Sequence, residues 1–463
     1  MNQVINKFMN KNKLEELYRE YRPAIHFSCK RGWMNDPNGL IFHEGWYHLY
    51  YQHYPDGVIH GPMHWGHART KDFLEWEELP VALSPDEKGM IFSGCMVYDK
   101  ENTTGFGTME DPPLVAVFTQ HIETKETSTQ YQSLAFSTDA GMTFQKYEGN
   151  PVLDLKLKDF RDPKVFWHPE ERKWIMLTAV EQEIRFFTSG NLKQWAEGAV
   201  FRANGLKTDV IWECPDLVEM PDDQGGKQWV LFVSQNTLDY AETGIRYFVG
   251  TFDGCSFCAE EGAEEELLVD FGRDNYAAAT YAEVKGRVIQ QSWMNCWAYA
   301  MKLPGEGFRG SMTLPRELGL RKTIEGYRLI QMPVREALEE LSLYIQMIEE
   351  NSEVFIDNIP GIYRIRPEKD IVKITFENNE SSLEIDVDFV HGKIAVDRSS
   401  LADASYGSCF QEIGRTCFQS RDNREIYMIL DVTSIEIFAA DGEAVGTFQY
   451  FTRTPFQRIR TGE

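Results

Sequence analysis

The chain of 463 residues lacks any hydrophobic run long enough to cross a membrane, and its first residues lack the apolar segment of a signal peptide. We therefore expect a cytoplasmic protein with no membrane partner. Positive charge is scarce: 47 Lys and Arg oppose 72 Asp and Glu, which gives a net charge of −25. Such a field repels nucleic-acid phosphates, so we expect no nucleic-acid partner and a small neutral or cationic substrate.

Cysteine and histidine are also sparse. The eight cysteines are scattered, and in a cytosolic chain we expect free thiols rather than a disulfide framework. Three of the ten histidines, His60, His64 and His67, would share one face of a helix, but two glycines and a proline among them disfavour a helix there. No acidic residue completes a zinc signature around them. We expect no metal and no cofactor.

Helical periodicity is nearly absent. Leu14, Leu17, Tyr18 and Tyr21 follow helical spacing and predict a short amphipathic helix before Pro23, within an N-terminal extension over residues 1–22. The next three hundred residues carry almost no such pattern. The fold class we expect is therefore all-β.

Repetition takes the place of helical periodicity. Short apolar strands recur about sixty residues apart: WYHLYYQ, PLVAVFTQ, KWIMLTAV, QWVLFVSQ and RVIQQSW. After each of the first four segments, the sequence contains an Asp or Asn four or five positions before an aromatic residue, as in ARTKDFLEW and FTSGNLKQW. Five such units of about four strands predict a five-bladed β-propeller over residues 23–332. A large irregular β-sandwich would produce a similar pattern and is the alternative.

The pattern changes after Pro333. Apolar residues then alternate four and three positions apart, at Val334, Leu338, Leu341, Ile345 and Ile348. This spacing predicts a connecting helix over residues 333–350, although parts of it also fit a strand-like linker. Period-two alternation with turn signals returns in residues 351–463, as in SSLEIDVDF, and predicts a C-terminal β-sandwich that supports the first domain.

Three acidic residues stand out by their surroundings: Asp36 in MNDPNG, Asp162 in FRDPKVFW and Glu213 in IWECPDL. Each lies at the edge of a predicted strand, next to a proline or one residue away from it. Because a residue before proline is driven into extended geometry, the backbone there aims the side chain. The innermost strands of a propeller converge on its centre, so these acids from different repeats can meet in one funnel.

A pair of carboxylates is the equipment of glycoside hydrolysis, in which one attacks or activates water and the other protonates the leaving group. Flat apolar faces for sugar C–H groups are available on Trp33, Trp65, Trp212, Trp293 and Trp297. Hydrogen bonds to hydroxyl groups are available from Asn35, Gln52, Ser93 and Arg161. The alternative for the tryptophans, chiefly Trp65 and Trp297, is that they fill the interfaces between blades.

The motifs WMNDPNG, YYQ, HWGHA, FSG, FRDPKVFW, WECPDL and DFGRDNYAA resemble, in this order, those of glycoside hydrolase family 32. That family includes invertases, sucrose-6-phosphate hydrolases, levanases and inulinases. The resemblance runs from about Pro23 to Leu320 and continues weakly into the C-terminal part. It implies a five-bladed propeller followed by a β-sandwich, and a β-fructofuranosidase that takes terminal fructose from sucrose and short fructans.

The resemblance also implies a role for each acid. Asp36 matches the nucleophile, Glu213 the general acid and base, and Asp162 the transition-state stabiliser that works with Arg161. Because the family retains the anomeric configuration, we expect the carboxyl groups of Asp36 and Glu213 to lie about 5–5.5 Å apart. The positions that match the fructose pocket are Asn35, Gln52, Phe92, Ser93 and Trp293.

Several functions remain open at this point. Sucrose-6-phosphate hydrolysis needs cations beside the glucose subsite, for which Lys30 and Arg31 are candidates. Fructosyl transfer uses the same covalent intermediate, and a non-catalytic carbohydrate-binding propeller is a third reading. Asn275 stands where the family commonly has an aromatic residue, which would reshape an outer subsite. The partner we expect is a small carbohydrate, and the oligomeric state is open, a homodimer included.

Overall fold

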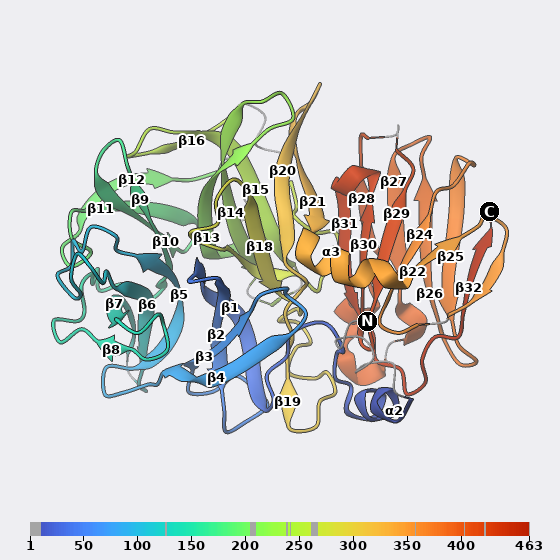
Figure 1. The fold of residues 1–463 in the computed structure, drawn as a ribbon, viewed down its shortest axis with the longest axis horizontal. Coiled ribbons are helices and arrows are strands. Elements are labelled where there is room, and N and C mark those ends of the chain that lie inside the picture. The colour runs from blue at the N-terminus through green and yellow to red at the C-terminus, as the bar shows by residue number, and fades with distance from the viewer. Residues whose placement is uncertain are drawn as a thin grey trace.

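In the computed structural model, the described residues are 11–125, 127–203, 210–237, 239–240, 242–260, 267–356, 358–401, 403–420 and 423–462. Strands dominate, and they form two bodies that lie side by side in Figure 1, a ring of sheets on the left and a layered pair of sheets on the right. No helix among these residues has the length and apolar character that a membrane crossing requires.

Five sheets precede Val334 in the described part of the chain. In spatial order, the first contains β19 (Phe308–Arg309), β1 (Gly32–His43), β2 (Trp46–Tyr54), β3 (His64–Thr70) and β4 (Trp76–Leu83). The second contains β5 (Met90–Tyr98), β6 (Leu114–Glu123), β7 (Ser128–Ser137) and β8 (Gln145–Lys146). The third contains β12 (Ala196–Phe201), β11 (Glu183–Ser189), β10 (Lys173–Val180) and β9 (Phe160–His168).

The ring is completed by two further sheets. The fourth contains β13 (Val210–Pro221), β14 (Lys227–Thr237), β15 (Thr243–Phe252) and β16 (Phe257–Ala259). The fifth contains β17 (Tyr276–Thr280), β18 (Val288–Trp293), β20 (Arg316–Thr323) and β21 (Gly326–Pro333). The first strands of the five sheets, β1, β5, β9, β13 and β17, contact one another in a closed circle. This is the radial arrangement of a propeller, with the first strands at the centre.

The repeats in the sequence correspond to fixed places in these sheets. The apolar repeat segments are the second strands, β2, β6, β10, β14 and β18. The Asp or Asn that follows in four of the units lies in the turn between the third and fourth strands, where its side chain accepts hydrogen bonds from backbone N–H groups two to four residues later. These residues are Asp72, Asp139, Asn191 and Asp253. The residue after each one has a positive φ, between 56° and 85°. The recurring Asp or Asn before an aromatic residue therefore marks a repeated turn that is capped by the side chain of that Asp or Asn.

Neighbouring sheets are joined by apolar clusters, one between each pair around the ring. Trp65 lies in the cluster between the first and second sheets, and Trp212 in the cluster between the third and fourth. Burying an aromatic side chain of this kind stabilises the fold by about 1.5–3 kcal/mol relative to leaving it exposed. The clusters therefore hold the sheets in the orientation that brings their first strands together.

The C-terminal body is a two-layered sandwich. One sheet contains β22 (Ile345–Ile348), β24 (Gly361–Ile365), β29 (Ile426–Leu430), β30 (Ser434–Ala439) and β31 (Ala444–Gln449). The other contains β23 (Glu353–Phe355), β32 (Arg458–Gly462), β25 (Ile371–Glu377), β26 (Ser382–Asp388), β27 (Lys393–Asp397) and β28 (Gly414–Cys417). Short 3-10 turns join some of these strands, η2 (Ser399–Leu401), η3 (Ala404–Tyr406), η4 (Ser408–Gln411) and η5 (Ala440–Gly442). The expected all-β architecture, a propeller followed by a sandwich, is confirmed, and a single irregular sandwich is excluded.

The segment between the two bodies differs from the expected helix over 333–350. A helix, α3, covers only Arg335–Leu341, and η1 (Ser342–Tyr344) ends it. Ile345–Ile348 then form β22, which pairs in parallel with β24 of the sandwich. Backbone hydrogen bonds to β24 replace the helical ones there, so the sandwich begins at Ile345 and not at residue 351. The N-terminal helix, α2 (Lys11–Glu20), packs Leu17 and Tyr18 into the sandwich core.

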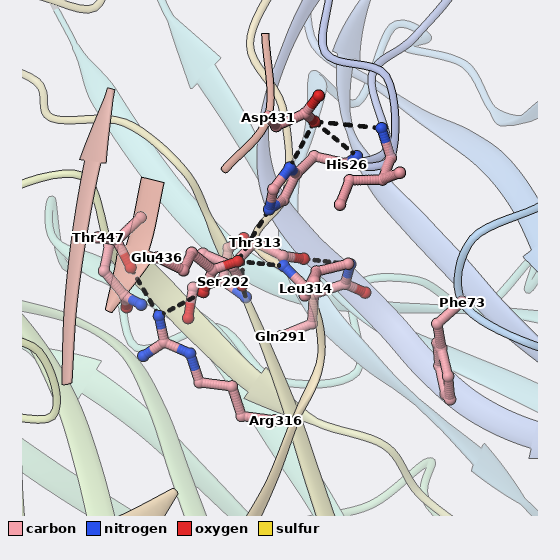
Figure 2. A network of polar contacts seen from close by, with 12 residues as sticks. His26, Phe73, Gln291, Ser292, Thr313, Leu314, Arg316, Asp431, Glu436 and Thr447 are labelled. Carbon is pink, nitrogen blue, oxygen red and sulfur yellow. Dashed lines mark hydrogen bonds and ion pairs between the residues drawn. The ribbon is translucent and has the colours of Figure 1, made fainter. Parts of the chain in front are cut away.

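Buried ions join the two bodies (Figure 2). His26 lies between two sandwich carboxylates: its Nδ1 is 2.7 Å from Asp431 Oδ2 and its Nε2 is 2.8 Å from Glu436 Oε1. Arg316 of the propeller donates to the other Glu436 oxygen over 2.7 Å and to Asp270 over 2.9 Å. Burial alone lowers the pKa of His26, but its bonds to both carboxylates outweigh that effect and raise the pKa to about 9. His26 is therefore held as a cation.

Candidate active site

Asp36 lies on β1 at a break in the pairing with β2, where the register shifts between Met34 and Pro37. One carboxylate oxygen accepts a hydrogen bond from the Asn35 side chain over 2.9 Å, and the other accepts one from the Ser93 hydroxyl over 2.6 Å. Burial raises the pKa of Asp36, the bonds from Ser93 and Asn35 oppose this, and the nearby charge of Glu213 adds to it. The bulge and the two donors fix the orientation of the carboxylate.

Asp162 lies on β9 with a φ of 62°, a left-handed conformation that costs energy for a residue with a side chain. Its Oδ2 accepts a hydrogen bond from the backbone N–H of Cys214 over 3.0 Å. The Cys214 sulfur lies 3.6 Å from the same oxygen and 3.7 Å from Asp36 Oδ2. Cys214 therefore lies between the two aspartates. Burial raises the pKa of Asp162 to about 7, against the pull of Arg161 and with support from the charges of Glu213 and Asp36.

Glu213 lies on β13 at an irregularity in strand pairing, between Glu213 and Asp216, and the pairing of β9 with β10 also shifts around Asp162, between Arg161 and Lys164. Its Oε1 is 3.2 Å from the guanidinium of Arg161, and its Oε2 accepts a hydrogen bond from the Tyr276 hydroxyl over 2.6 Å. Arg161 also lies 2.8 Å from Asp159 and 3.9 Å from Asp162. Arg161 thus contacts Asp162 and Glu213, and Cys214 contacts Asp36 and Asp162, so these two residues link the three predicted acids from three different sheets. Each of the three acids lies beside a bulge because its motif contains a proline, which cannot donate a hydrogen bond to the neighbouring strand.

Four of the predicted substrate-binding residues, Asn35, Phe92, Ser93 and Trp293, contact these acids or belong to the cluster beside them. Asn35 and Ser93 bind Asp36 directly, and Phe92 is the residue before Ser93 on β5. Gln52 and Trp293 are buried, and the Gln52 Nε2 and Trp293 Nε1 groups have no hydrogen-bond partner in the described part of the chain. A buried donor without a partner is costly, and a bound hydroxyl group would remove that cost. These are the donors one expects to face a sugar.

Three of the five tryptophans lie at this site. Trp33, Trp293 and Trp297 form one cluster with Tyr276, and the rings of Trp293 and Trp297 are 4.9 Å apart. Trp65 and Trp212 lie instead in the clusters between sheets. The role of sugar platform is therefore wrong for Trp212, and for Trp65 the structure supports the alternative, that it fills the interface between two blades. Trp297, for which the sequence leaves the same two roles open, belongs to the cluster at the site and is partly exposed.

Other expectations fall elsewhere in the structure. The amide of Asn275 is buried and lies 3.3 Å from Asp270, which in turn binds Thr447 of the sandwich. The side chain of Lys30 is 79% exposed and its ammonium group lies 3.8 Å from Glu78. Of the three histidines, His64 contacts the Pro62 carbonyl and His67 contacts His48.

Two residues of the site were not singled out from the sequence. Tyr276 donates to Glu213, and Cys214 lies between Asp36 and Asp162. Both belong to quoted motifs, DFGRDNYAA and WECPDL, but a tyrosine or a cysteine has no spacing that distinguishes a site residue from a core residue. Only the convergence of β13 and β17 at the centre of the ring gives them these contacts.

Two cavities lie along the same central strands. A small one of about 30 Å³ lies against Ser93, Asp162 and Cys214, and a larger one of about 620 Å³ lies at the opposite ends of the strands and touches none of the three acids. Lys164 lines both, and its ammonium group binds Asp216 and Thr280. The large cavity is therefore distinct from the acid site.

Comparisons with known proteins agree with this geometry. The profile of the "Glycosyl hydrolases family 32 N-terminal domain" matches residues 26–333. A levanase of Bacillus subtilis is 40% identical over 92% of this chain, which spans 66% of the levanase, slightly under two thirds of its length. An extracellular exo-inulinase of Aspergillus awamori is 32% identical over 93% of this chain and 89% of its own.

Solved structures give the same result. A fructofuranosidase from Schwanniomyces occidentalis, complexed with fructose, is 30% identical, with a TM-score of 0.83 over 96% of this chain and 95% of its own. The profile covers the whole propeller, including all three acids, and the structural likeness extends through the sandwich. The chain belongs to glycoside hydrolase family 32.

Proposed function

We propose that the chain is a retaining β-fructofuranosidase that releases terminal fructose from sucrose and short fructo-oligosaccharides. The observation that carries this proposal is the convergence of Asp36, Asp162 and Glu213 from three sheets, linked by Arg161, which contacts Asp162 and Glu213, and by Cys214, which contacts Asp36 and Asp162. Two of these carboxylates supply the nucleophile and the acid that a retaining glycosidase needs. The third remains to hold the sugar.

In the first step Asp36 attacks the anomeric carbon of the fructosyl unit, and Glu213 gives its proton to the departing glycosidic oxygen. The hydrogen bonds from Ser93 and Asn35 favour the ionised form of Asp36 and hold it in place for attack. The products of this step are a fructosyl ester on Asp36 and the released sugar. Asp162 and Arg161 bind ring hydroxyl groups of the fructosyl unit and form no covalent bond in this step.

In the second step Glu213, now ionised, takes a proton from water, and the water oxygen displaces Asp36 from the anomeric carbon. Two inversions leave fructose with the configuration of the substrate. Arg161 and Tyr276 stabilise the ionised Glu213 that this step begins with. A sugar hydroxyl in place of water would give transfer, so the two outcomes compete for the same ester.

Sucrose and short fructans are the substrates we favour, because the similar proteins are a levanase and an exo-inulinase. Sucrose 6-phosphate is less favoured. Its phosphate would need a free cation beside the leaving-group subsite, whereas Lys30 lines a cavity with Arg22, Trp46 and Trp76 that contains none of the three acids. Arg161 is already shared among three carboxylates.

Product analysis tests the proposal. The purified protein is incubated with sucrose, sucrose 6-phosphate, kestose, inulin and levan, and the products are separated by chromatography. We expect free fructose from the unphosphorylated substrates and no early oligosaccharide products from inulin. A predominance of longer saccharides would identify a transferase, and the absence of fructose from every substrate would overturn the proposal.

Cytoplasmic location and a carbohydrate as the only partner are parts of the same proposal. Among the similar proteins is an extracellular enzyme, so location needs its own experiment. Fructosidase activity measured in cytosolic and culture fractions of the source cells tests it. Size-exclusion chromatography with light scattering determines whether the protein is a homodimer.

A further inference from the structure

Arg398 lies in the sandwich, directly after β27, yet all its polar contacts converge on one buried point beside the propeller. Its side chain is 1% exposed. One end of the guanidinium forms an ion pair with Asp274 of the propeller and also donates to the Gln449 carbonyl over 2.7 Å. The other end donates to the Tyr299 hydroxyl over 2.9 Å, and Nε donates to the Phe410 carbonyl over 2.9 Å. Tyr299 in turn donates to Asp274 over 2.7 Å.

The propeller segment from Asp270 to Asp274 is docked on the edge strand β31 of the sandwich. The backbone N–H of Phe271 donates to the Val445 carbonyl over 2.9 Å, and that of Gln449 donates to the Asp274 carboxylate over 2.8 Å. Gly272 allows this approach, since a Cβ atom there would lie 2.0 Å from the Thr447 carbonyl oxygen. The segment therefore covers a sheet edge that would otherwise be unpaired.

Both propeller partners of Arg398 are two residues away from a side chain of the active site. Asp274 precedes Tyr276, whose hydroxyl donates to Glu213 over 2.6 Å. Tyr299 follows Trp297, whose ring lies 6.0 Å from that of Trp33 and 4.9 Å from that of Trp293. The turn that carries Tyr299 is itself closed by backbone hydrogen bonds from Ala300 to Cys296 and from Leu303 to Tyr299. One guanidinium thus ties together the two segments that build this wall of the site.

We propose that Arg398 is a positioning residue of the glycosidase: through Asp274 it sets the place of Tyr276, and through Tyr299 it sets the place of Trp297. This inference rests on the proposed fructosidase function, and it gives the sandwich a part in catalysis. A lysine cannot replace Arg398, because a single ammonium group cannot reach Asp274, Tyr299, Gln449 and Phe410 in one plane as the guanidinium fork does.

A purely stabilising role would lower the amount of folded protein and leave the reaction of the folded fraction unchanged. A positioning role makes a different demand. Glu213 must protonate a sugar leaving group, whereas an aryl leaving group departs with little help from an acid. Misplacing Tyr276 should therefore impair the hydrolysis of sucrose more than that of an aryl β-fructofuranoside.

The test compares kcat/KM for these two substrates in Arg398→Met, Arg398→Lys and Tyr299→Phe. Met keeps the bulk of the side chain without its charge, and Tyr299→Phe removes only the hydroxyl that Arg398 and Asp274 share. We expect the sucrose value to fall by about 10-fold to 100-fold in Arg398→Met and the aryl value by less than about 3-fold. Arg398→Lys should not restore sucrose hydrolysis. Tyr299→Phe should move the ratio in the same direction, and it serves where Arg398→Met does not fold.

Arg287→Met is the matched control, since Arg287 is another largely buried arginine of the propeller whose partners, Glu317 and Glu336, lie outside the two segments. It should change both substrates by the same factor. An unchanged ratio in folded Arg398 and Tyr299 variants, or an equal change of ratio in Arg287→Met, would overturn the positioning role. If the unaltered protein releases fructose from neither substrate, the proposed function itself fails, so the two failures are distinguishable.

Discussion

The hydroxyl of Tyr276 lies 2.6 Å from Oε2 of Glu213 and donates its hydrogen to that carboxylate. The two residues belong to adjacent sheets and are 63 positions apart in the chain. Arg161 binds the other oxygen of Glu213 over 3.2 Å. The carboxyl group of the proposed acid is therefore held from both sides before any substrate binds.

Replacing Tyr276 by Phe removes the hydrogen bond to Glu213 and keeps the aromatic ring. A hydrogen bond to a charged group contributes about 1.5–3 kcal/mol, so we expect kcat/KM for sucrose to fall by about 10-fold to 100-fold. Steady-state rates of fructose release measure the effect. Tyr281→Phe is the control, because Tyr281 is also buried but donates to Gln291 and not to an acid. An equal loss in both variants would contradict the role of Tyr276.

The roles of Asp36 and Glu213 predict different products when azide is added. Asp36→Ala should fold normally and release no fructose from sucrose; with azide, the anion takes the place of the missing carboxylate and gives a fructosyl azide of inverted configuration. Glu213→Ala should still form the ester from an aryl β-fructofuranoside, and azide then intercepts it to give the retained configuration. Nuclear magnetic resonance of the isolated azides distinguishes them. Exchanged configurations would mean that the two roles are reversed.

The sequence contained the repeat and the acids because both depend on local chemistry. The Asp or Asn that follows each of the first four apolar segments caps a turn through its own side chain. A proline close to each acid interrupts a strand at that position. Such signals extend over a few residues, so one sequence suffices to detect them. The five apolar segments are detectable for the same reason, since each forms the second strand of its sheet.

Contacts between distant segments could not be predicted in this way. Trp33 and Trp212 are the same residue type beside similar motifs, yet one lies at the site and the other between two sheets. Arg398 and Asp274 are 124 positions apart, and nothing local in either motif indicates the pair. The linker is a further example. The spacing of Ile345 and Ile348 alone fits a helix, but in the structure this segment pairs with β24 as a strand.

Asp162 should make the folded protein less stable as the pH rises. Burial raises its pKa to about 7 from an ordinary value near 4, so the folded state holds a proton that the unfolded state has lost between these pH values. Asp162 therefore does not affect the free energy of unfolding below pH 4. Its ionisation lowers this free energy as the pH rises to about 7, and its effect is constant above that pH. Asp162→Asn carries no charge at any pH. We expect it to be inactive and more stable than the parent by about 1–4 kcal/mol at pH 7.5, with little difference at pH 4.

Thermal and denaturant unfolding of both proteins between pH 4 and pH 8 measure this difference. Tyr281→Phe, which leaves the three acids and their hydrogen-bond donors in place, is the control and should keep the parent's pH dependence in this range. An Asp162→Asn variant whose advantage does not grow between pH 4 and pH 7 would show that the carboxyl group of Asp162 ionises without cost in the folded state.

His26 should have the opposite pH dependence, at the interface between the propeller and the sandwich. Its pKa is raised to about 9 from an ordinary value near 6.5, because Asp431 and Glu436 outweigh the effect of burial. The stabilisation is therefore complete below pH 6.5 and is lost as the pH rises through 9. His26→Gln should unfold more easily than the parent by about 3 kcal/mol at pH 6, since a buried carboxylate pair loses its cation. Denaturant unfolding at pH 6 and pH 9.5 should show this difference shrinking at the higher pH, and a difference independent of pH would mean that His26 is neutral in the folded protein.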